Sequence, residues 1–143
     1  MTVRTILSHK GRDVVTIAPT ATLSEAVKLL SERRIGAAVI TGADDRVAGI
    51  LSERDIVRVI GERGHAALEE NVGAVMTRNV VTCTGAETVT AIMERMTAHR
   101  FRHLPVVEQN KLVGIISIGD VVKRRVEEIE GESNALREYI ATA

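Results

Sequence analysis

Two short stretches of the chain place a serine and an aspartate at matching positions of one repeated pattern. The stretches read Gly-Ile-Leu-Ser-Glu-Arg-Asp-Ile-Val at 49–57 and Gly-Ile-Ile-Ser-Ile-Gly-Asp-Val-Val at 114–122. Ser52 with Asp55, and Ser117 with Asp120, have the spacing at which two side chains cap the first turn of a helix. The same groups suit a nucleotide, because a carboxylate can accept both hydroxyls of a ribose, and a serine hydroxyl with first-turn N–H groups can hold a phosphate. Both interpretations, cap and ribose-phosphate site, are open at each turn.

Each turn closes a longer repeat, and the repeat decides the architecture. In the first copy an apolar strand at 14–17 precedes a helix that starts at Thr22, with Glu25 in the capping-box position. Two more strands follow, at 37–40 and 47–51, joined by a tight turn. The second copy offers strands at 80–83, 104–107 and 112–116 and a helix that starts at Thr88. Each unit is predicted to run strand–helix–strand–strand–helix, which is an α/β (α+β) fold.

Composition limits the classes of function. The chain has 143 residues, 19 basic and 19 acidic side chains and only two aromatic ones, so we expect a Val, Ile, Leu, Ala and Met core and no nucleic-acid partner. Cys83 is expected to be a small buried hydrophobe, and the isolated His9 and His65 predict no metal site. No apolar run reaches the roughly 20 residues that span a bilayer, so we expect no membrane association and a cytoplasmic protein.

The remaining segments connect or extend the repeats. We assign the first repeat to 8–62, a linker to 63–72 with a short helical piece around 66–68, the second repeat to 73–127 and a helical tail to 128–143. The tail is predicted to form a charged helix over 127–140, interrupted at Gly131. Its apolar residues could pack on the body or on a partner chain, and the sequence leaves both open; they are Val126, Ile129, Leu136 and Ile140.

The chain resembles a tandem pair of cystathionine-β-synthase (CBS) domains. The resemblance rests on the duplicated Gly-φ-φ-Ser-x-x-Asp turn, on His-Leu-Pro-Val-Val at 103–107, and on Met76-Thr77 ahead of Val80. It implies one compact module with a pseudo-two-fold axis and two similar clefts. In many members such clefts hold AMP, ADP, ATP or S-adenosylmethionine, and in some small members NAD(H). The resemblance also implies a homodimer.

The resemblance places residues in each cleft. In one, Ser117, Gly119 and Asp120 would face the ligand, with Arg102 and His103 near its phosphate. Uncharged or small groups from the first repeat would line the adenine pocket of the same cleft; they are Ile35, Gly36, Val15 and Thr16. Lys10 is either a basic element that closes over a phosphate or part of an exposed turn. Arg100 is expected to face solvent.

The opposite cleft would use a second set of residues; they are Ser52, Arg54, Asp55, Val81 and Thr82. Arg54 stands where the second repeat has Gly119, which adds a cation and also bulk. We therefore expect the Asp120 cleft to be the better nucleotide site of the two.

The function predicted from these features is that of an adenine-nucleotide-binding sensor, for AMP/ADP/ATP or NAD(H), acting through ligand-dependent conformational change on a downstream effector outside this chain. We expect no catalytic residue and no required cofactor, since no nucleophile–base pair or Gly-rich phosphate loop can be found. The alternative is a ligand-free interaction or scaffold protein in which the Ser-x-x-Asp turns serve only as caps.

Overall fold

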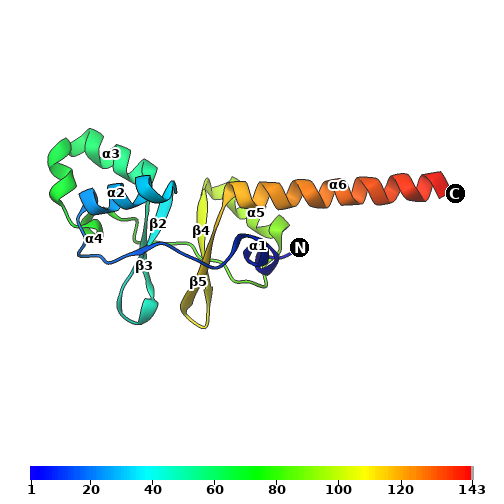
Figure 1. Ribbon diagram of the computed structural model, residues 1–143, viewed down its shortest axis with the longest axis horizontal. Coiled ribbons are helices and arrows are strands. Elements are labelled where there is room, and N and C mark those ends of the chain that lie inside the picture. The colour runs from blue at the N-terminus through cyan, green and yellow to red at the C-terminus, as the bar shows by residue number, and fades with distance from the viewer. Residues whose placement is uncertain (143) are drawn as a thin grey trace.

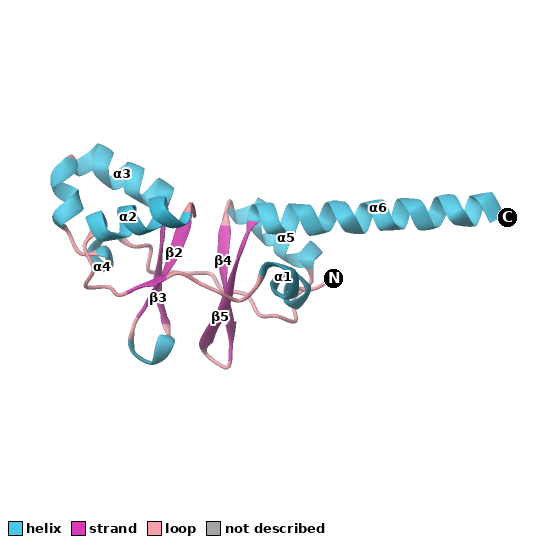
Figure 2. Ribbon diagram, viewed as in Figure 1, coloured by secondary structure: helices cyan, strands magenta, loops and turns pink. Residues whose placement is uncertain are grey.

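Two β-hairpins lie side by side in the middle of the molecule, and helices cover their outer sides (Figure 1, Figure 2). The computed structural model describes residues 1–142. The first hairpin joins β2 (Ala37–Thr41) to β3 (Val47–Ser52), and the second joins β4 (His103–Glu108) to β5 (Lys111–Ser117). This mixed arrangement of small sheets and helices confirms the predicted α+β class and the pairing of two similar units.

The first unit has the predicted order of elements. A two-residue strand, β1 (Thr16–Ile17), runs parallel to β2, which is antiparallel to β3. The helix α2 (Leu23–Arg33) follows β1, a single 3₁₀ turn, η1 (Ala43–Asp45), joins the hairpin strands, and α3 (Glu53–Arg63) ends the unit. Thr22 caps α2 in the capping box with Glu25 that the sequence predicts.

The second unit lacks one predicted strand. Residues 80–83 form only an isolated bridge from Cys83 to Val106 beside β4. Cys83 N–H donates to Pro105 O at 3.0 Å and Cys83 O accepts from Val107 N–H at 2.9 Å, whereas Thr82 O accepts from the Arg95 guanidinium at 2.9 Å. The expected strand at 80–83 is therefore wrong, whereas the helix after Thr88 is present as α5 (Val89–His99).

The two units exchange short helices. The helix that precedes the first unit in the sequence packs on the second unit, and the helix that precedes the second unit packs on the first. The N-terminal helix α1 (Val3–Lys10) packs against β5, and its Val3, Ile6 and Leu7 are buried in the second core. The predicted linker contains η2 (His65–Glu69) and α4 (Val72–Val75), and α4 packs against β3 in the first core. The short helical piece expected near 66–68 is thus confirmed, and this exchange joins the two units into one body.

The glycine of each repeated turn lies under the exchanged segment. A Cβ at Gly49 would lie 2.8 Å from Met76 Cγ, and a Cβ at Gly114 would lie 2.7 Å from Leu7 Cδ2. Because any side chain there would clash, the glycine recurs where one chain segment crosses close to another. The side chains that form the two cores are Val, Ile, Leu, Ala, Met and Cys, as composition predicts.

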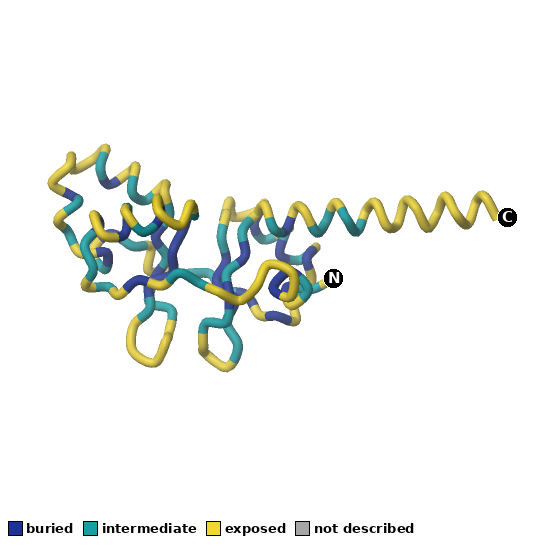
Figure 3. The backbone as a smooth tube through the Cα atoms, in the orientation of Figure 1, coloured by how far each residue is buried: buried dark blue, intermediate teal, exposed yellow. Residues whose placement is uncertain are grey.

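The last helix, α6 (Ile118–Thr142), differs from the prediction because it is continuous through Gly131. A single glycine costs a helix only about 1 kcal/mol relative to alanine, and a Cβ at Gly131 would meet nothing within 4 Å. The helix starts against α5 and then extends past the body, so that its second half is exposed on all sides (Figure 3). No helix within residues 1–142 is long and apolar enough to cross a membrane.

Candidate functional site

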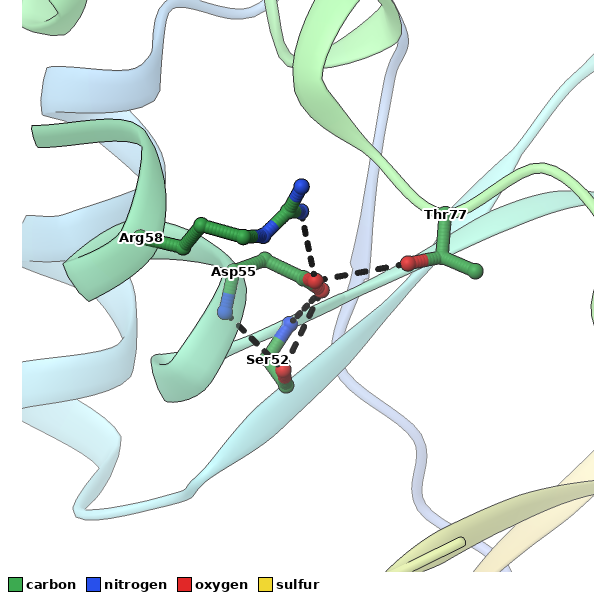
Figure 4. Close-up of polar contacts among 4 residues, drawn as sticks. All are labelled: Ser52, Asp55, Arg58 and Thr77. Atoms are coloured by element: carbon green, nitrogen blue, oxygen red, sulfur yellow. Dashed lines mark hydrogen bonds and ion pairs between the residues drawn. The ribbon is translucent and has the colours of Figure 1, made fainter. Parts of the chain in front are cut away.

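The Ser52–Asp55 turn forms a complete capping box at the start of α3. Ser52 N–H donates to Asp55 Oδ2 at 2.9 Å, and Asp55 N–H donates to Ser52 Oγ at 3.3 Å. The other carboxylate oxygen of Asp55 accepts from Arg58 at 3.2 Å and from the Thr77 hydroxyl at 3.3 Å (Figure 4). The capping role is therefore confirmed, and contacts from Ser52, Arg58 and Thr77 hold the carboxylate in one orientation.

The Ser117–Asp120 turn repeats this cap at the start of α6 but carries a different outer partner. Ser117 N–H donates to Asp120 Oδ2 at 2.8 Å, and Asp120 N–H donates to Ser117 Oγ at 3.2 Å. The ammonium of Lys10 donates to Asp120 Oδ2 at 2.7 Å and to Ile115 O at 2.9 Å. Lys10 therefore binds the aspartate that the resemblance expects to hold the ribose.

Lys10 takes the place that Thr77 has in the other unit. Thr77 pairs with Ile50 through two backbone hydrogen bonds, and its hydroxyl reaches Asp55. One ammonium makes the corresponding contacts to Ile115 and Asp120. Burial by itself would raise the pKa of Asp120, but the hydrogen bonds from Lys10 and Ser117 and the charge of Lys10 hold that pKa below its ordinary value. The two turns share a cap and differ in what covers the carboxylate.

An open cavity of about 280 Å³ lies beside the first turn, between the two units. One wall comes from the first unit and the short segment after α4, and the other is the segment that leads into β4. Its lining residues are Gly36, Ile50, Ser52, Glu53, Arg54, Asp55, Thr77, Arg100, Phe101, Arg102 and His103. Arg102 and His103 therefore line the cavity on the Asp55 side, and they also adjoin the Asp120 turn, because His103 pairs with Ser117 and Arg102 O accepts from Ile118 N–H at 2.8 Å.

The cavity carries an excess of positive charge. Arg54, Arg100 and Arg102 line it, and within residues 1–142 none of the three forms an ion pair with a carboxylate. The N-terminus of α3 points into the same space with its partial positive charge. Glu53 and Asp55 are the acidic residues of the lining. Unpaired guanidinium groups beside a helix N-terminus form a site suited to phosphate.

His103 lies between the two turns. A Cβ at Gly36 would lie 3.6 Å from its Cε1 atom, so the ring packs against the backbone of the first unit. Burial and the charge of Lys10 lower the pKa of His103 below its ordinary value, and Arg102 adds to this effect, whereas Asp120 and Glu53 oppose it. The His103 ring lines the cavity, and its lowered pKa favours the neutral imidazole there.

Some of the sequence-predicted site residues do not line this cavity. Ile35 borders a separate surface hollow with Ile56 and Val57, and Thr82 borders another with Arg46. Val15 packs in the first core and Val81 in the second, and Thr16 belongs to β1. Gly119 and Asp120 lie at the turn bound by Lys10.

Sequence reasoning missed other members of the lining. Thr77, Phe101 and Glu53 were not predicted, and Arg100 was expected only to face solvent; it is exposed but also borders the cavity. The signal for Thr77 was present, since Met76-Thr77 comes ahead of 80–83 in the second repeat at the position that Lys10-Gly11 has ahead of 14–17 in the first. No group of three or more His, Cys, Asp or Glu side chains among the described residues could hold a metal ion.

Comparison with known proteins gives the family to which these features correspond. The family model described as "CBS domain" matches the chain twice, at residues 3–62 and 72–127. A CBS-domain containing protein from Agrobacterium tumefaciens has a solved structure with 49% sequence identity and a TM-score of 0.84, and the match covers 87% of this chain and 99% of that one. The two matched segments each contain one of the Ser-x-x-Asp turns.

Two further relatives define the range of the similarity. The mitochondrial CBS domain-containing protein CBSX3 of Arabidopsis thaliana is 37% identical over 123 residues, which are 83% of this chain and 60% of that protein. The chain therefore spans less than two thirds of the length of this relative. A CBS domain pair solved in complex with 5′-methylthioadenosine and S-adenosyl-L-methionine has 23% identity and a TM-score of 0.79, covering 90% of this chain and 98% of that one. This last likeness concerns the fold.

Proposed function

The chain belongs to the CBS-domain family, and on that premise we propose that it is a regulatory module that binds an adenine nucleotide without chemical turnover. The observation that carries this proposal is the cavity of about 280 Å³ in which Arg54 of the Ser52–Asp55 turn lies with Arg100 and Arg102, three arginines without an ion-pair partner among residues 1–142. A structural relative that binds adenosine compounds gives independent support for the class of ligand.

The cavity offers a separate partner for each part of a nucleotide. The phosphates would bind Arg54, Arg100 and Arg102, because planar guanidinium groups match phosphate oxygens in pairs. The N–H of Glu53 donates to Gly36 O and the N–H of Asp55 donates to Ser52 Oγ, so Arg54 N–H is the first-turn donor left for a ligand. Asp55 would accept the ribose hydroxyls in place of Thr77 and Arg58. Ile50 and Phe101 supply apolar surface for the base.

This proposal prefers the Asp55 side, in contrast to the expectation from the sequence. At the other turn the Lys10 ammonium already binds Asp120, so a ribose would have to displace an ion pair before it could bind. Arg54 adds a cation at the open cavity, where the second unit has Gly119 at the corresponding position. One nucleotide per chain, bound between the units, is the expected stoichiometry.

Binding between the units provides a route to regulation. A ligand held by Asp55 from one unit and Arg102 from the other stabilises one relative arrangement of the two, and it shifts the population in favour of that arrangement. The effect is limited to the difference in affinity between the two arrangements. An effector that contacts both units would detect the shift.

The direct test is thermal unfolding and calorimetric titration with AMP, ATP, NADH and S-adenosylmethionine, and with GTP as the control for the base. A ligand at 100 times its dissociation constant should stabilise the protein by about 2.7 kcal/mol. Arg102→Ala should weaken binding by about tenfold or more, since a charge-assisted hydrogen bond contributes about 1.5–3 kcal/mol.

The matched control is Arg46→Ala, which removes an exposed arginine from the far end of the first hairpin. It should leave nucleotide affinity unchanged. If no adenine compound stabilises the protein at millimolar concentration, the nucleotide proposal is wrong and the ligand-free scaffold is the better interpretation. Release of a product from ATP or NADH by the purified protein would contradict the absence of catalysis.

A further inference from the structure

The helix α6 carries an exposed apolar stripe from its first turns to its end, which we call the seam. It consists of Val122, Val126, Ile129, Ser133, Leu136 and Ile140. The apolar members are between 40% and 65% exposed, so they pack on neither unit of the body. This settles one of the two options that the sequence left open for these residues, because the body does not cover them.

The spacing of the seam is that of a coiled coil. Its members are separated by four, three, four, three and four residues, which is the alternation of a and d positions in a heptad repeat. Val126, Ser133 and Ile140 take the a positions, and β-branched residues at a are typical of two-stranded coils. Gly131 falls at f, on the face opposite the seam, where its missing side chain removes nothing from a helix–helix contact.

The charges beside the seam are complementary to those of a second identical helix. In a parallel pair, the g position of one helix faces the e position of the next heptad in its partner. Glu132 is at g and Arg137 is at e, so two such contacts form by symmetry. Among residues 1–142, neither side chain has an ion-pair partner within its own chain. Arg125 at g faces Glu130 at e in the same way, although Arg125 now pairs with Glu128.

An antiparallel pair over the same residues would be repelled. It would place Glu130 against Glu130 and Glu132 against Glu132 of the second helix, and Lys123 against Arg137. Like charges at these flanking positions select against a wrong orientation. The charge pattern therefore distinguishes between the two orientations and favours the parallel one.

A lone helix of this kind is poorly stabilised. Residues 131–142 are all exposed, whereas most helical stability in proteins comes from packing of an amphipathic face. We propose that the seam pairs with the seam of a second copy of this chain in a parallel, two-stranded coiled coil. Such a contact is isologous and closes at two chains, as expected for a two-fold symmetric dimer. The two bodies would lie together at one end of the coil.

The test measures association of the full chain by sedimentation equilibrium. Leu136→Asp puts a charge at a d position and should raise the dimer dissociation constant by about tenfold or more. Ala135→Asp is the matched control, since it puts the same charge one residue away, outside the seam, and should leave association unchanged. Arg137→Glu should weaken the dimer, and the double variant Glu132→Arg with Arg137→Glu should recover it.

Orientation is tested with a thiol-specific crosslinker of short reach. Ser133→Cys should be joined to Ser133→Cys of the second copy, because equal a positions face each other only in a parallel pair. Ala135→Cys should give little crosslinked product. A dimer that Leu136→Asp leaves intact, or a wild-type chain that stays monomeric at about 100 µM, overturns the proposal. A dimer that Ser133→Cys does not crosslink overturns the parallel orientation.

Discussion

At each turn the serine and aspartate side chains accept hydrogen bonds from one another's backbone N–H groups, so part of their hydrogen-bonding capacity is already used. In the first turn, Oδ2 of Asp55 and Oγ of Ser52 are used by the cap, so a ribose must compete for Oδ1 with Arg58 and Thr77. Those two partners are exposed and are easily replaced by ligand hydroxyls. The cap therefore fixes the orientation of the carboxylate and is compatible with the proposed binding role.

Asp55→Asn separates the two roles. The amide keeps one oxygen for the cap, so the free energy of unfolding without ligand should fall by only about 1 kcal/mol. A ribose loses a charged acceptor, so affinity for the best adenine nucleotide should fall by about tenfold or more. Chemical unfolding and calorimetric titration measure the two effects. Asp44→Asn, in the exposed hairpin turn, is the control, and equal nucleotide affinity in Asp55→Asn and the wild type would leave the aspartate as a cap only.

His103 makes the stability of the unliganded protein depend on pH. Burial first, and then the charge of Lys10, lower its pKa in the folded state, so the unfolded chain binds a proton more readily. Stability should therefore be highest above the unfolded pKa of about 6.5 and should fall as the pH drops from there toward the folded pKa. The thermal midpoint between pH 7.5 and pH 5.5 measures this loss. His103→Gln should show a smaller loss, and an equal loss in both proteins would exclude His103 as its source.

At the scale of elements, the end of α1 is held to the start of α6 by Lys10 and Asp120. The pair is about one-third exposed, so it contributes only about 0.5–1 kcal/mol to stability at neutral pH. Lys10→Met should lose that amount. Because the folded pKa of Asp120 is lowered, the contribution is present above its unfolded pKa and is lost as the pH falls through the folded value.

The measurement is chemical unfolding of the wild type and Lys10→Met at pH 7 and near pH 3. The two proteins should differ at the first pH and converge at the second. Arg12→Met, two residues further along an exposed stretch, is the matched control and should equal the wild type at both. A difference that persists unchanged at low pH would show that the lysine acts through packing of its side chain and not through its charge.

Local signals predicted the elements that depend on neighbouring residues. The helix starts at Thr22, Thr88, Ser52 and Ser117 follow from side-chain caps within three residues, and all four are confirmed. The strand at 80–83 is reduced to a single bridge at Cys83, and the Thr82 carbonyl accepts from Arg95, which lies 13 residues further along the chain on α5. A propensity for β structure cannot report such a distant competitor.

The sequence identified many residues of the candidate site but not which of them lie together in one cavity. Ser52, Arg54, Asp55, Arg102 and His103 were all named from the sequence, and the structure brings them to one cavity. Which residues share a cavity depends on which unit each segment faces. At the Ser117–Asp120 turn the carboxylate is covered by Lys10, which is 110 residues from Asp120 in the chain. The sequence shows that the two turns differ at Arg54 and Gly119, but only the fold shows that Lys10 covers Asp120.

For the whole molecule, the exchange of α1 and α4 means that neither core is made from one continuous repeat. The second core contains Val3, Ile6 and Leu7, which precede the first repeat's strands, and the first core contains Val72 and Val75 from the connection. A family match that starts at residue 3 agrees with an N-terminal helix that is part of the body. We therefore expect the two units to unfold together.

Ile6→Ala tests this coupling, because Ile6 is 1% exposed and lies in the second core only. Removing its buried methyl and methylene groups should cost about 2–5 kcal/mol, from lost burial and the cavity left behind. In a cooperative body the amides of both cores should then exchange faster, although no atom of the first core has changed. Hydrogen exchange followed by mass spectrometry can read α2 and α5 separately. Val57→Ala, at a side chain that is 72% exposed on α3, is the matched control and should alter neither. Faster exchange in α5 with unchanged exchange in α2 would mean that each unit unfolds independently. A ligand bound between the units would then have to introduce the cooperativity of unfolding that the free protein lacks.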